Sequence, residues 1–162
     1  MNNLESIKHI PLTQGEYALV DDVDYEELSK HKWHFTRGYA VRDNTVNGHH
    51  TTMRMHRQIL RASPGDQTDH INRNKLDNRR CNLRLCTNWQ NMCNRKKMSN
   101  NKSGFKGVTW NKKDKKWGAH IRANKRYVWL GYFTDKEEAA RKYNEAAIYL
   151  HGDYAVLNEF TK

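Results

Sequence analysis

The most informative segment of this chain is residues 69–94, DHINRNKLDNRRCNLRLCTNWQNMCN. It places a carboxylate beside an imidazole at Asp69 and His70, a carboxamide 12 residues after His70 at Asn82, and another 21 residues after His70 at Asn91. An Asp-His pair alone is weak evidence for a site, because such dipeptides arise by chance. The two asparagines at fixed distances make the pattern informative.

Local signals inside this stretch predict a strand followed by a helix. Residues 83–86 alternate apolar and polar side chains, as a short half-buried strand does. Thr87 followed three residues later by Gln90 is a capping box, so we expect a helix to begin there and to run to about Arg95. Asn91 lies off the apolar face of this helix and can face the preceding loop. By the i, i+3, i+4 rule that apolar face holds Trp89, Met92 and Cys93.

The four polar residues of the first pattern resemble the HNH nuclease motif, in the variant whose last position is Asn instead of His. The resemblance implies a ββα-metal (His-Me finger) fold over about residues 66–95. In that fold a strand ends near His70, a loop and a return strand follow, and a helix brings a second metal ligand back. We therefore expect an α+β chain with an HNH nuclease domain at residues 1–95, similar to phage and intron-encoded enzymes.

The resemblance also implies a role for each residue in phosphodiester hydrolysis. His70, with an unperturbed pKa of about 6.5, is expected to take the proton of the attacking water. Asp69 and Asn91 are expected to bind a divalent ion, and oxygen ligands suit Mg²⁺ or Mn²⁺ better than Zn²⁺. Asn82 is expected to fix the loop and thereby the orientation of His70. The candidates for binding flanking phosphates, which the sequence does not rank, are Arg73, Arg79, Arg80 and Arg84.

The composition favours a polyanionic partner. The 162 residues carry a formal net charge of +11, which is beyond what solubility requires. No apolar run approaches the roughly 18 residues of a membrane span, and the N-terminus has no signal-peptide pattern. We therefore expect a soluble protein of the cytoplasm, that of the host cell if the gene is carried by a phage.

Three cysteines, an odd number, argue against a secreted disulfide scaffold and fit a reducing compartment. A zinc ion bound by Cys81, Cys86 and Cys93 is left open as an alternative. Structural zinc usually takes four ligands in paired spacings, and the sequence has no CxxC pair. A small buried thiol is the favoured role for each cysteine.

The region before the motif is expected to support it. Residues 1–30 hold seven acidic side chains against two basic ones, so this part is not expected to contact phosphates. Residues 33–41 predict a hairpin that turns at Arg37-Gly38. Its large apolar side chains are expected in the core: Trp33, Phe35, Tyr39 and Val41. Five histidines share no ligand-like spacing, which favours solvated or hydrogen-bonded side chains: His31, His34, His49, His50 and His56.

The C-terminal part predicts a three-stranded antiparallel sheet packed on one helix, after a basic linker at residues 96–103. Residues 117–123 alternate between two faces, Asn124-Lys125 can turn the chain, and residues 127–133 return it. A capping box at residues 134–137, beginning with Thr134, opens a helix that Gly152 ends. The buried stripe of this helix is expected to be Ala139, Ala140, Tyr143, Ala146, Ala147 and Leu150.

Four segments of this part resemble the plant apetala (ethylene-response-factor) DNA-binding domain: FKGV at 105–108, VWLGYF at 128–133, EAARKY at 138–143 and AVLN at 155–158. The resemblance implies a domain at residues 104–162 that lays its sheet in the major groove of double-stranded DNA. Arg122 and Trp129 match the family directly, whereas Thr109, Asn111 and Tyr127 stand where the plant proteins usually have arginine. The expected DNA-binding residues are Lys106, Thr109, Asn111, His120, Arg122, Arg126, Tyr127 and Trp129.

These observations predict a metal-dependent, site-specific but sequence-tolerant DNA endonuclease of the homing kind. A monomer with one catalytic centre is expected to nick one strand. Two alternatives stay open. A DNA-binding regulator could keep a nuclease-like scaffold, although that leaves Asp69, His70 and Asn91 unexplained. An RNA-binding protein could stack single-stranded bases on the aromatic side chains that lie among Lys and Arg.

Overall fold

The computed structural model describes residues 6–46 and 48–160 and divides the chain into two compact units, Met1–Thr87 and Asn88–Lys162. Both units combine helices with antiparallel strands, which confirms the predicted α+β class. No helix in the described part of the chain is long and apolar enough to cross a membrane.

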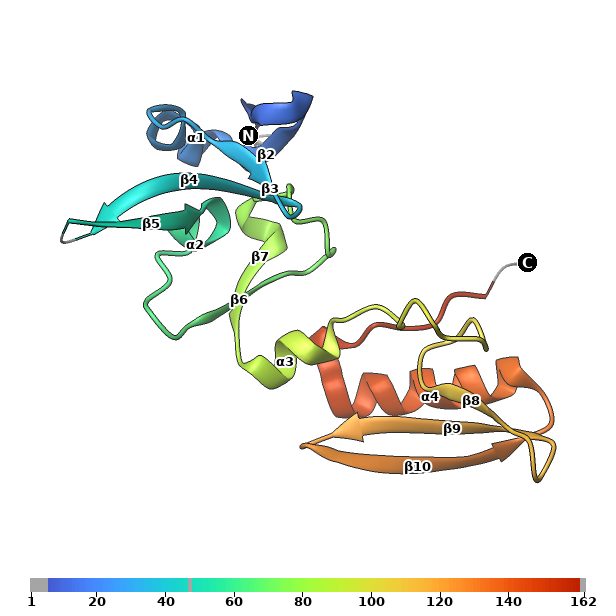
Figure 1. The fold of residues 1–162 in the computed structure, drawn as a ribbon. Coiled ribbons are helices and arrows are strands. Elements are labelled where there is room, and N and C mark those ends of the chain that lie inside the picture. The colour runs from blue at the N-terminus through green and yellow to red at the C-terminus, as the bar shows by residue number, and fades with distance from the viewer. Residues whose placement is uncertain (1–5, 47, 161–162) are drawn as a thin grey trace, which may run out of the picture. The chain divides into compact units, whose positions relative to one another are not determined.

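The first unit is built from short antiparallel sheets with short helices between them (Figure 1). Strand β1 pairs with β2, β3 to β5 form a three-stranded sheet in that order, and β6 pairs with β7. In chain order the elements are β1 (Ile7–Pro11), the 3-10 turn η1 (Thr13–Gly15), β2 (Tyr17–Asp21), α1 (Asp22–Ser29), β3 (His34–Thr36), β4 (Tyr39–Val46), β5 (His49–Arg54), α2 (Met55–Ile59), β6 (Gln67–His70), the 3-10 turn η2 (Arg80–Asn82) and β7 (Leu83–Cys86).

The core of this unit reaches the hairpin that carries Asp69 and His70. Trp33 is 5% exposed, and its indole N–H donates to the carbonyl of Leu28 at 2.8 Å, which satisfies the one polar atom of a large buried ring. Val41 is buried as predicted, and Leu83 at the start of β7 belongs to the core. The other buried apolar members are Ile10, Leu12, Ala18, Val20, Leu28, Ala40, Met55 and Ile59.

A turn and a loop of the first unit position the residues of the candidate site. The predicted turn at Arg37-Gly38 has φ angles of 50° and 85°, the left-handed pair of a two-residue hairpin between β3 and β4. The loop between β6 and β7 is attached to β2, because Leu19 donates to Leu76 and accepts from Asn78, each at 2.8 Å. The loop is therefore held by backbone bonds to a core strand.

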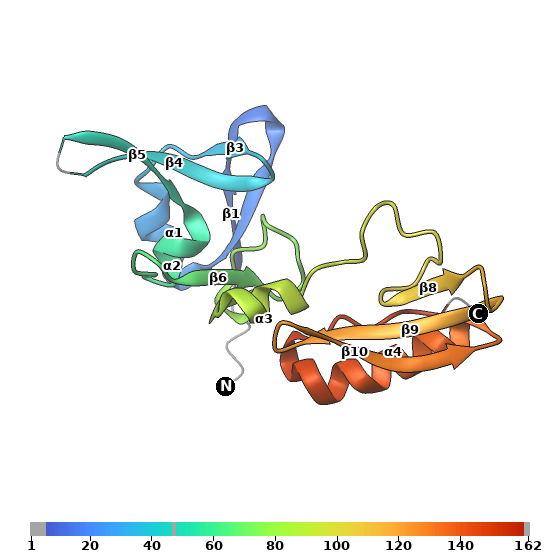
Figure 2. The ribbon, with the colours of Figure 1, turned by 60° about the horizontal axis from the view of Figure 1, so that its bottom comes forward.

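The second unit is a three-stranded antiparallel sheet in the order β10-β9-β8, with α4 packed on one face (Figures 1 and 2). This confirms the predicted sheet-on-helix architecture. Helix α3 groups with this unit, whereas the sequence had placed it in a domain ending at residue 95. The elements are α3 (Asn88–Cys93), β8 (Val108–Asn111), β9 (Lys116–Ala123), β10 (Arg126–Phe133), α4 (Lys136–His151) and the 3-10 turn η3 (Gly152–Tyr154).

Helix α4 lies close to the sheet because its inner face is mostly alanine, with Ala139, Ala140 and Ala147 fully buried. Its cap is one residue later than predicted, since the side chain of Asp135, not Thr134, accepts the backbone N–H of Glu137 at 2.8 Å. Gly152 ends the helix with φ 53°, as predicted. The expected stripe is otherwise right except at its end, where the exposed fraction of Leu150 is 37%.

A bulge in β10 changes which side chains face outward. The register pairs Trp129 with His120 but Gly131 with Ala119, so one extra residue lies between Trp129 and Gly131. Gly131 adopts φ 123°, which side chains rarely permit. Tyr132 is thereby on the same outward face as Trp129, 4.7 Å from it between ring centroids, although strict alternation would have turned Tyr132 toward α4.

Candidate functional site

Asp69 and His70 are the last two residues of β6, and both are buried, at 7% and 6% exposure. In the register of the hairpin Asp69 lies opposite Arg84 and His70 opposite Leu83. The Arg84 guanidinium donates to Oδ2 of Asp69 from Nε at 3.0 Å and from Nη2 at 2.8 Å. Both bonds reach the same carboxylate oxygen, and this paired contact balances the carboxylate charge.

Asn78 holds the His70 ring, and sequence reasoning missed this residue. Asn78 is 1% exposed, and its Oδ1 lies 3.4 Å from His70 Nε2 while its Nδ2 donates to the Leu76 carbonyl at 3.1 Å. Because the amide oxygen can only accept, this contact favours the tautomer of the neutral His70 ring that carries its proton on Nε2. Burial lowers the pKa of His70, and the bond to Asn78 opposes that shift in part.

His56 lies against His70, with ring centroids 4.7 Å apart, and Tyr39 lies 5.4 Å from His56 and 6.2 Å from His70. The sequence predicts a solvated or hydrogen-bonded His56. The prediction of a solvated side chain is wrong, because His56 is only 3% exposed. Burial, followed by electrostatic interactions with His70, Arg54 and Arg57, lowers the pKa of His56 to about 3. The cluster joins β4, α2 and β6, so spacing along the chain gives no sign of it.

This buried histidine predicts a pH dependence of stability. The pKa of His56 is depressed in the folded state, so stability is fully present above the ordinary histidine pKa of about 6.5. Between about pH 6.5 and 3 only the unfolded chain takes up the proton, and His56 removes about 1.4 kcal/mol of unfolding free energy for each pH unit. Pulse proteolysis in urea at pH 7, 6 and 5 is expected to show a flatter profile for His56→Gln than for the wild type. Identical slopes would contradict the assignment.

Two exposed cations flank Tyr39 beside the buried histidines. The Arg54 guanidinium lies 4.8 Å and the Lys75 ammonium 4.2 Å from the centroid of the Tyr39 ring. Cations held over an aromatic face are oriented without losing their charge. Neither residue stands out in the sequence, because Arg54 ends β5 and Lys75 lies in the loop after β6.

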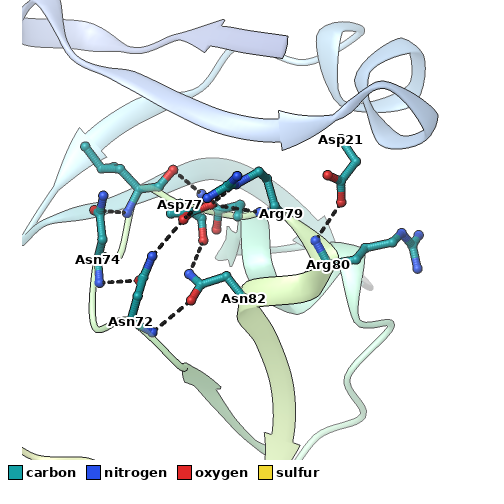
Figure 3. A network of polar contacts seen from close by, with 9 residues as sticks. Asp21, Asn72, Asn74, Asp77, Arg79, Arg80 and Asn82 are labelled. Carbon is teal, nitrogen blue, oxygen red and sulfur yellow. Dashed lines mark hydrogen bonds and ion pairs between the residues drawn. The ribbon is translucent and has the colours of Figure 1, made fainter. Parts of the chain in front are cut away.

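The loop between β6 and β7 is held by a polar network around Asp77 (Figure 3). Asp77 is 2% exposed and accepts from Arg79 Nε and Nη2 and from Asn72 Nδ2, each at 2.7 Å. The Arg79 guanidinium holds the pKa of Asp77 below its usual value. Asn82 bonds to two separate parts of the loop. Its Oδ1 accepts from the backbone N–H of Asn72 at 2.8 Å, and its Nδ2 donates to the backbone carbonyl of Asp77 at 2.7 Å.

The predicted phosphate-binding arginines have different surroundings. Arg79 is paired with the buried Asp77, and Arg80 donates to both carboxylate oxygens of Asp24 at 2.8 and 2.7 Å. Both guanidinium groups are therefore engaged within the protein. Arg73 is exposed, in a left-handed turn with φ 66°. Arg84, the fourth candidate, is paired with Asp69. Phosphate binding by these arginines stays a prediction.

The predicted metal ligands lie in different units, Asp69 in the first and Asn91 on α3 in the second, and their joint binding of an ion stays a prediction. Among residues 6–46 and 48–160 no three His, Cys, Asp or Glu side chains gather as metal ligands. Of the three cysteines Cys93 is buried, Cys86 half-buried and Cys81 exposed, and zinc binding by them stays an open alternative. The expected pair of ligands, the Asp69 carboxylate and the Asn91 amide, is not a group of this kind, so the finding does not bear on it.

The outward face of the second sheet carries the predicted DNA-binding side chains. The register places Tyr127 opposite Arg122 and Trp129 opposite His120 on this face. Trp129 is 53% exposed and covers Gly118, where an added Cβ would lie 2.5 Å from the indole. The bulge adds Tyr132, which sequence reasoning had not placed here. Thr109, Arg122 and Arg126 are exposed.

Asn111 and Lys106, two of the predicted DNA-binding residues, bond within the protein. The Asn111 amide donates to Asp114 Oδ2 at 2.8 Å and to the Tyr132 hydroxyl at 2.7 Å. The Lys106 ammonium donates to the carbonyls of Cys93 and Arg95 at 2.8 and 2.7 Å, at the end of α3. DNA contacts by these two residues stay predictions.

Comparison with known proteins agrees with both parts of the chain. An uncharacterized HNH endonuclease of Acanthamoeba polyphaga mimivirus is 32% identical over 153 residues, which cover 90% of this chain and 76% of that protein. The chain belongs to the HNH endonuclease family. In this HNH family member the AP2 domain family matches residues 103–153. A protein of Oryza sativa subsp. japonica named for its AP2/ERF and B3 domains is 45% identical over 56 residues, 35% of this chain and 17% of that protein.

No solved structure matches this HNH family member. Three residues of the nuclease motif, Asp69, His70 and Asn82, lie in its N-terminal unit. Its AP2 domain indicates DNA binding. The comparisons thus confirm the combination of an HNH nuclease with an apetala-type domain that the sequence predicted.

Proposed function

We propose that this HNH endonuclease is a metal-dependent, site-specific but sequence-tolerant DNA nuclease of the homing kind that nicks one strand. One observation carries the proposal. Asp69 and His70 end the same strand, and each is held by a dedicated partner, Arg84 for the carboxylate and Asn78 for the imidazole. Burying and fixing two ionisable groups side by side costs stability, which is typical of a reaction centre.

His70 is the proposed general base. Its neutral ring, with the proton on Nε2 toward Asn78, has the Nδ1 lone pair that can accept a proton from water. The low pKa caused by burial keeps the ring neutral at neutral pH, so the base is in its active form. Asn82 keeps the loop closed behind this ring through its bonds to Asn72 and Asp77. Asn78 and Asn82 are therefore positioning residues.

Arg54 and Lys75 are the proposed contacts to the DNA backbone beside the scissile phosphate. Both are exposed and lie on Tyr39, whose ring contacts His70. Arg79 and Arg80 are weaker candidates for binding the DNA backbone than the sequence alone indicates, because each forms an ion pair within the protein, with Asp77 and Asp24 respectively. Exposed lysine and arginine side chains supply most of the salt-dependent affinity for a phosphate backbone.

The donors present fit a hard divalent cation. Asp69 contributes a buried carboxylate and Asn91 a neutral amide oxygen, and Mg²⁺ or Mn²⁺ prefers oxygen ligands and keeps several waters. In this proposal the helix that carries Asn91 completes a ββα-metal unit with β6 and β7. The bound ion would supply Lewis-acid stabilisation of the phosphate and the leaving oxygen.

The outward sheet face of the AP2 domain is the proposed reader of the DNA major groove. Arg122 is exposed on the middle strand and matches an arginine of that family, and a bidentate arginine contact to guanine contributes about 1–3 kcal/mol of discrimination. Arg122→Ala is expected to weaken binding to a selected DNA site by about tenfold and to relax its sequence preference. Fluorescence anisotropy at fixed salt measures this, with Lys142→Ala on α4 as the control. Equal losses in both variants would point to general electrostatics.

The test of the proposed function is a supercoiled-plasmid assay with Mg²⁺ and with EDTA. We expect the open-circular product with Mg²⁺ and intact plasmid with EDTA, because the reaction needs the ion. A protein that binds duplex DNA tightly but leaves the plasmid intact in both conditions would be a DNA-binding regulator instead. Preference for single-stranded RNA in competition would identify an RNA-binding protein.

A further inference from the structure

Helix α3 is attached to the AP2 domain by its apolar face. Trp89 packs edge-on against His151 at the end of α4, with ring centroids 5.8 Å apart and an interplanar angle of 78°. Cys93 is 3% exposed. Met92 and Cys93 on α3 line a pocket of about 160 Å³ together with Tyr143 on α4. The helix has six residues, too few to be stable by itself in water, so these contacts fix its place.

Lys106 closes the end of this helix. Its ammonium donates to the carbonyl of Cys93, the last residue of α3, and to that of Arg95 just beyond the helix. The last carbonyls of a helix have no partner within it. Burial raises the pKa of the Cys93 thiol, and the nearby charge of Lys106 opposes that shift. One side chain thus connects the AP2 domain to the last turn of α3.

The backbone of Lys106 is itself rigidly held. Its N–H donates to Asn158 Oδ1 at 2.6 Å, and its carbonyl accepts from Asn158 Nδ2 at 3.0 Å. Asn158 is in turn bonded to Asn144 on α4 through two hydrogen bonds of 2.7 and 2.9 Å. The next residue, Gly107, has no room for a side chain, since an added Cβ would lie 2.1 Å from the Tyr143 ring.

The same end of α4 also contacts β9, the strand that carries Arg122. His151 Nε2 donates to the backbone carbonyl of Arg122 at 2.8 Å, while its ring packs on Trp89. The strand that carries Arg122, the end of α4 and the helix that carries Asn91 are therefore linked by consecutive contacts within one compact unit.

We propose that Lys106 is a positioning residue for Asn91, and that the AP2 domain both reads DNA and holds the helix that supplies a metal ligand. This rests on the proposed function, in which Asn91 binds the ion. Lys106 was predicted to contact DNA, but its ammonium is committed to helix carbonyls. The AP2 domain therefore contributes to the rate of cleavage as well as to affinity.

The test compares Lys106→Met, which keeps the length of the side chain without its charge, with Lys142→Met on α4. Removing a residue that orients a metal ligand typically costs 10–100-fold in activity or metal affinity. In Lys106→Met we expect a cleavage rate at saturating DNA at least about tenfold lower, a higher Mg²⁺ requirement and an unchanged Kd for DNA. Lys106→Arg, which can donate to the same two carbonyls, is expected to restore most of the rate.

A second readout does not depend on activity. If Lys106 holds α3, the buried Cys93 is expected to react faster with a thiol reagent in Lys106→Met than in the wild type. The exposed Cys81 provides the reference rate within the same chain. Mass spectrometry of the labelled peptides separates the two thiols. Should Lys106→Met not fold, Trp89→Leu removes the contact with His151 and is expected to give the same pattern.

The outcomes distinguish this inference from the proposed function. If the wild type does not cleave, or Asn91→Ala cleaves normally, the proposed function fails whatever Lys106 does. If the wild type cleaves, Asn91→Ala does not, and Lys106→Met keeps the wild-type rate and Cys93 labelling, the positioning role is overturned. A Lys106→Met variant that loses only DNA affinity would identify Lys106 as a phosphate contact.

Discussion

Replacing His70 with alanine is expected to lower the single-turnover rate of DNA cleavage by about 10²–10⁴-fold, the usual contribution of a general base. In the proposed mechanism the ring accepts the proton of the attacking water through Nδ1, the nitrogen that does not face Asn78. His70 is 6% exposed, so its loss is expected to change the Kd for DNA by less than twofold. Single-turnover cleavage and anisotropy binding, both with Mg²⁺, measure the two effects.

His50→Ala is the control for this prediction, because His50 is an exposed histidine on β5. It is expected to cleave at the wild-type rate. A His70→Ala variant that cleaves as fast as His50→Ala would remove His70 from the reaction. A loss of DNA affinity equal to the loss of rate would make His70 a binding residue.

Replacing Asp77 with alanine is expected to destabilise the first unit by about 1.5–3 kcal/mol, the usual contribution of hydrogen bonds to a charged group. Asp77 accepts two bonds from Arg79 and one from Asn72, and it is 2% exposed. Because its pKa is lowered in the folded state, this stabilisation is present at neutral pH and is lost as falling pH protonates the carboxylate. The experiment therefore belongs at pH 7.

Amide hydrogen exchange of peptides from β2 and β7 in the full chain measures this effect, because both strands border the loop that Asp77 organises. The matched control is Asp24→Ala, which breaks the ion pair with the half-exposed Arg80. A pair of this kind contributes about 1 kcal/mol or less. Equal protection losses in the two variants would show that the Asp77 network is no more than a surface contact.

Much of the fold follows from local patterns in the sequence. The strand at Leu83–Cys86, the helix that begins at Asn88 and the sheet packed on α4 were all predicted from alternation and capping signals. Such signals depend on neighbouring residues, so they survive without knowledge of the tertiary structure. The cap at Asp135 shows the limit of these signals. Thr134 and Asp135 are adjacent capping residues, and the sequence does not rank them.

The candidate site depends on contacts that local patterns do not record. His56 meets His70 across two elements, and Asn78 reaches the same ring from a loop that looks like an ordinary asparagine-rich turn. The engagement of Arg79 by Asp77 and of Lys106 by helix carbonyls likewise depends on folding. Charge alone therefore overstates how many cations of this chain are free for DNA.

In the proposed function a divalent ion is held by Asp69 and Asn91 beside His70, and a Mg²⁺ titration of plasmid cleavage measures whether Asn91 binds it. The comparison is between Asn91→Ala and Asn88→Ala, two asparagines of α3. We expect that Asn91→Ala needs at least about tenfold more Mg²⁺ for half-maximal rate or does not cleave, while Asn88→Ala follows the wild-type curve. An Asn91→Ala variant with the wild-type Mg²⁺ dependence would contradict this expectation.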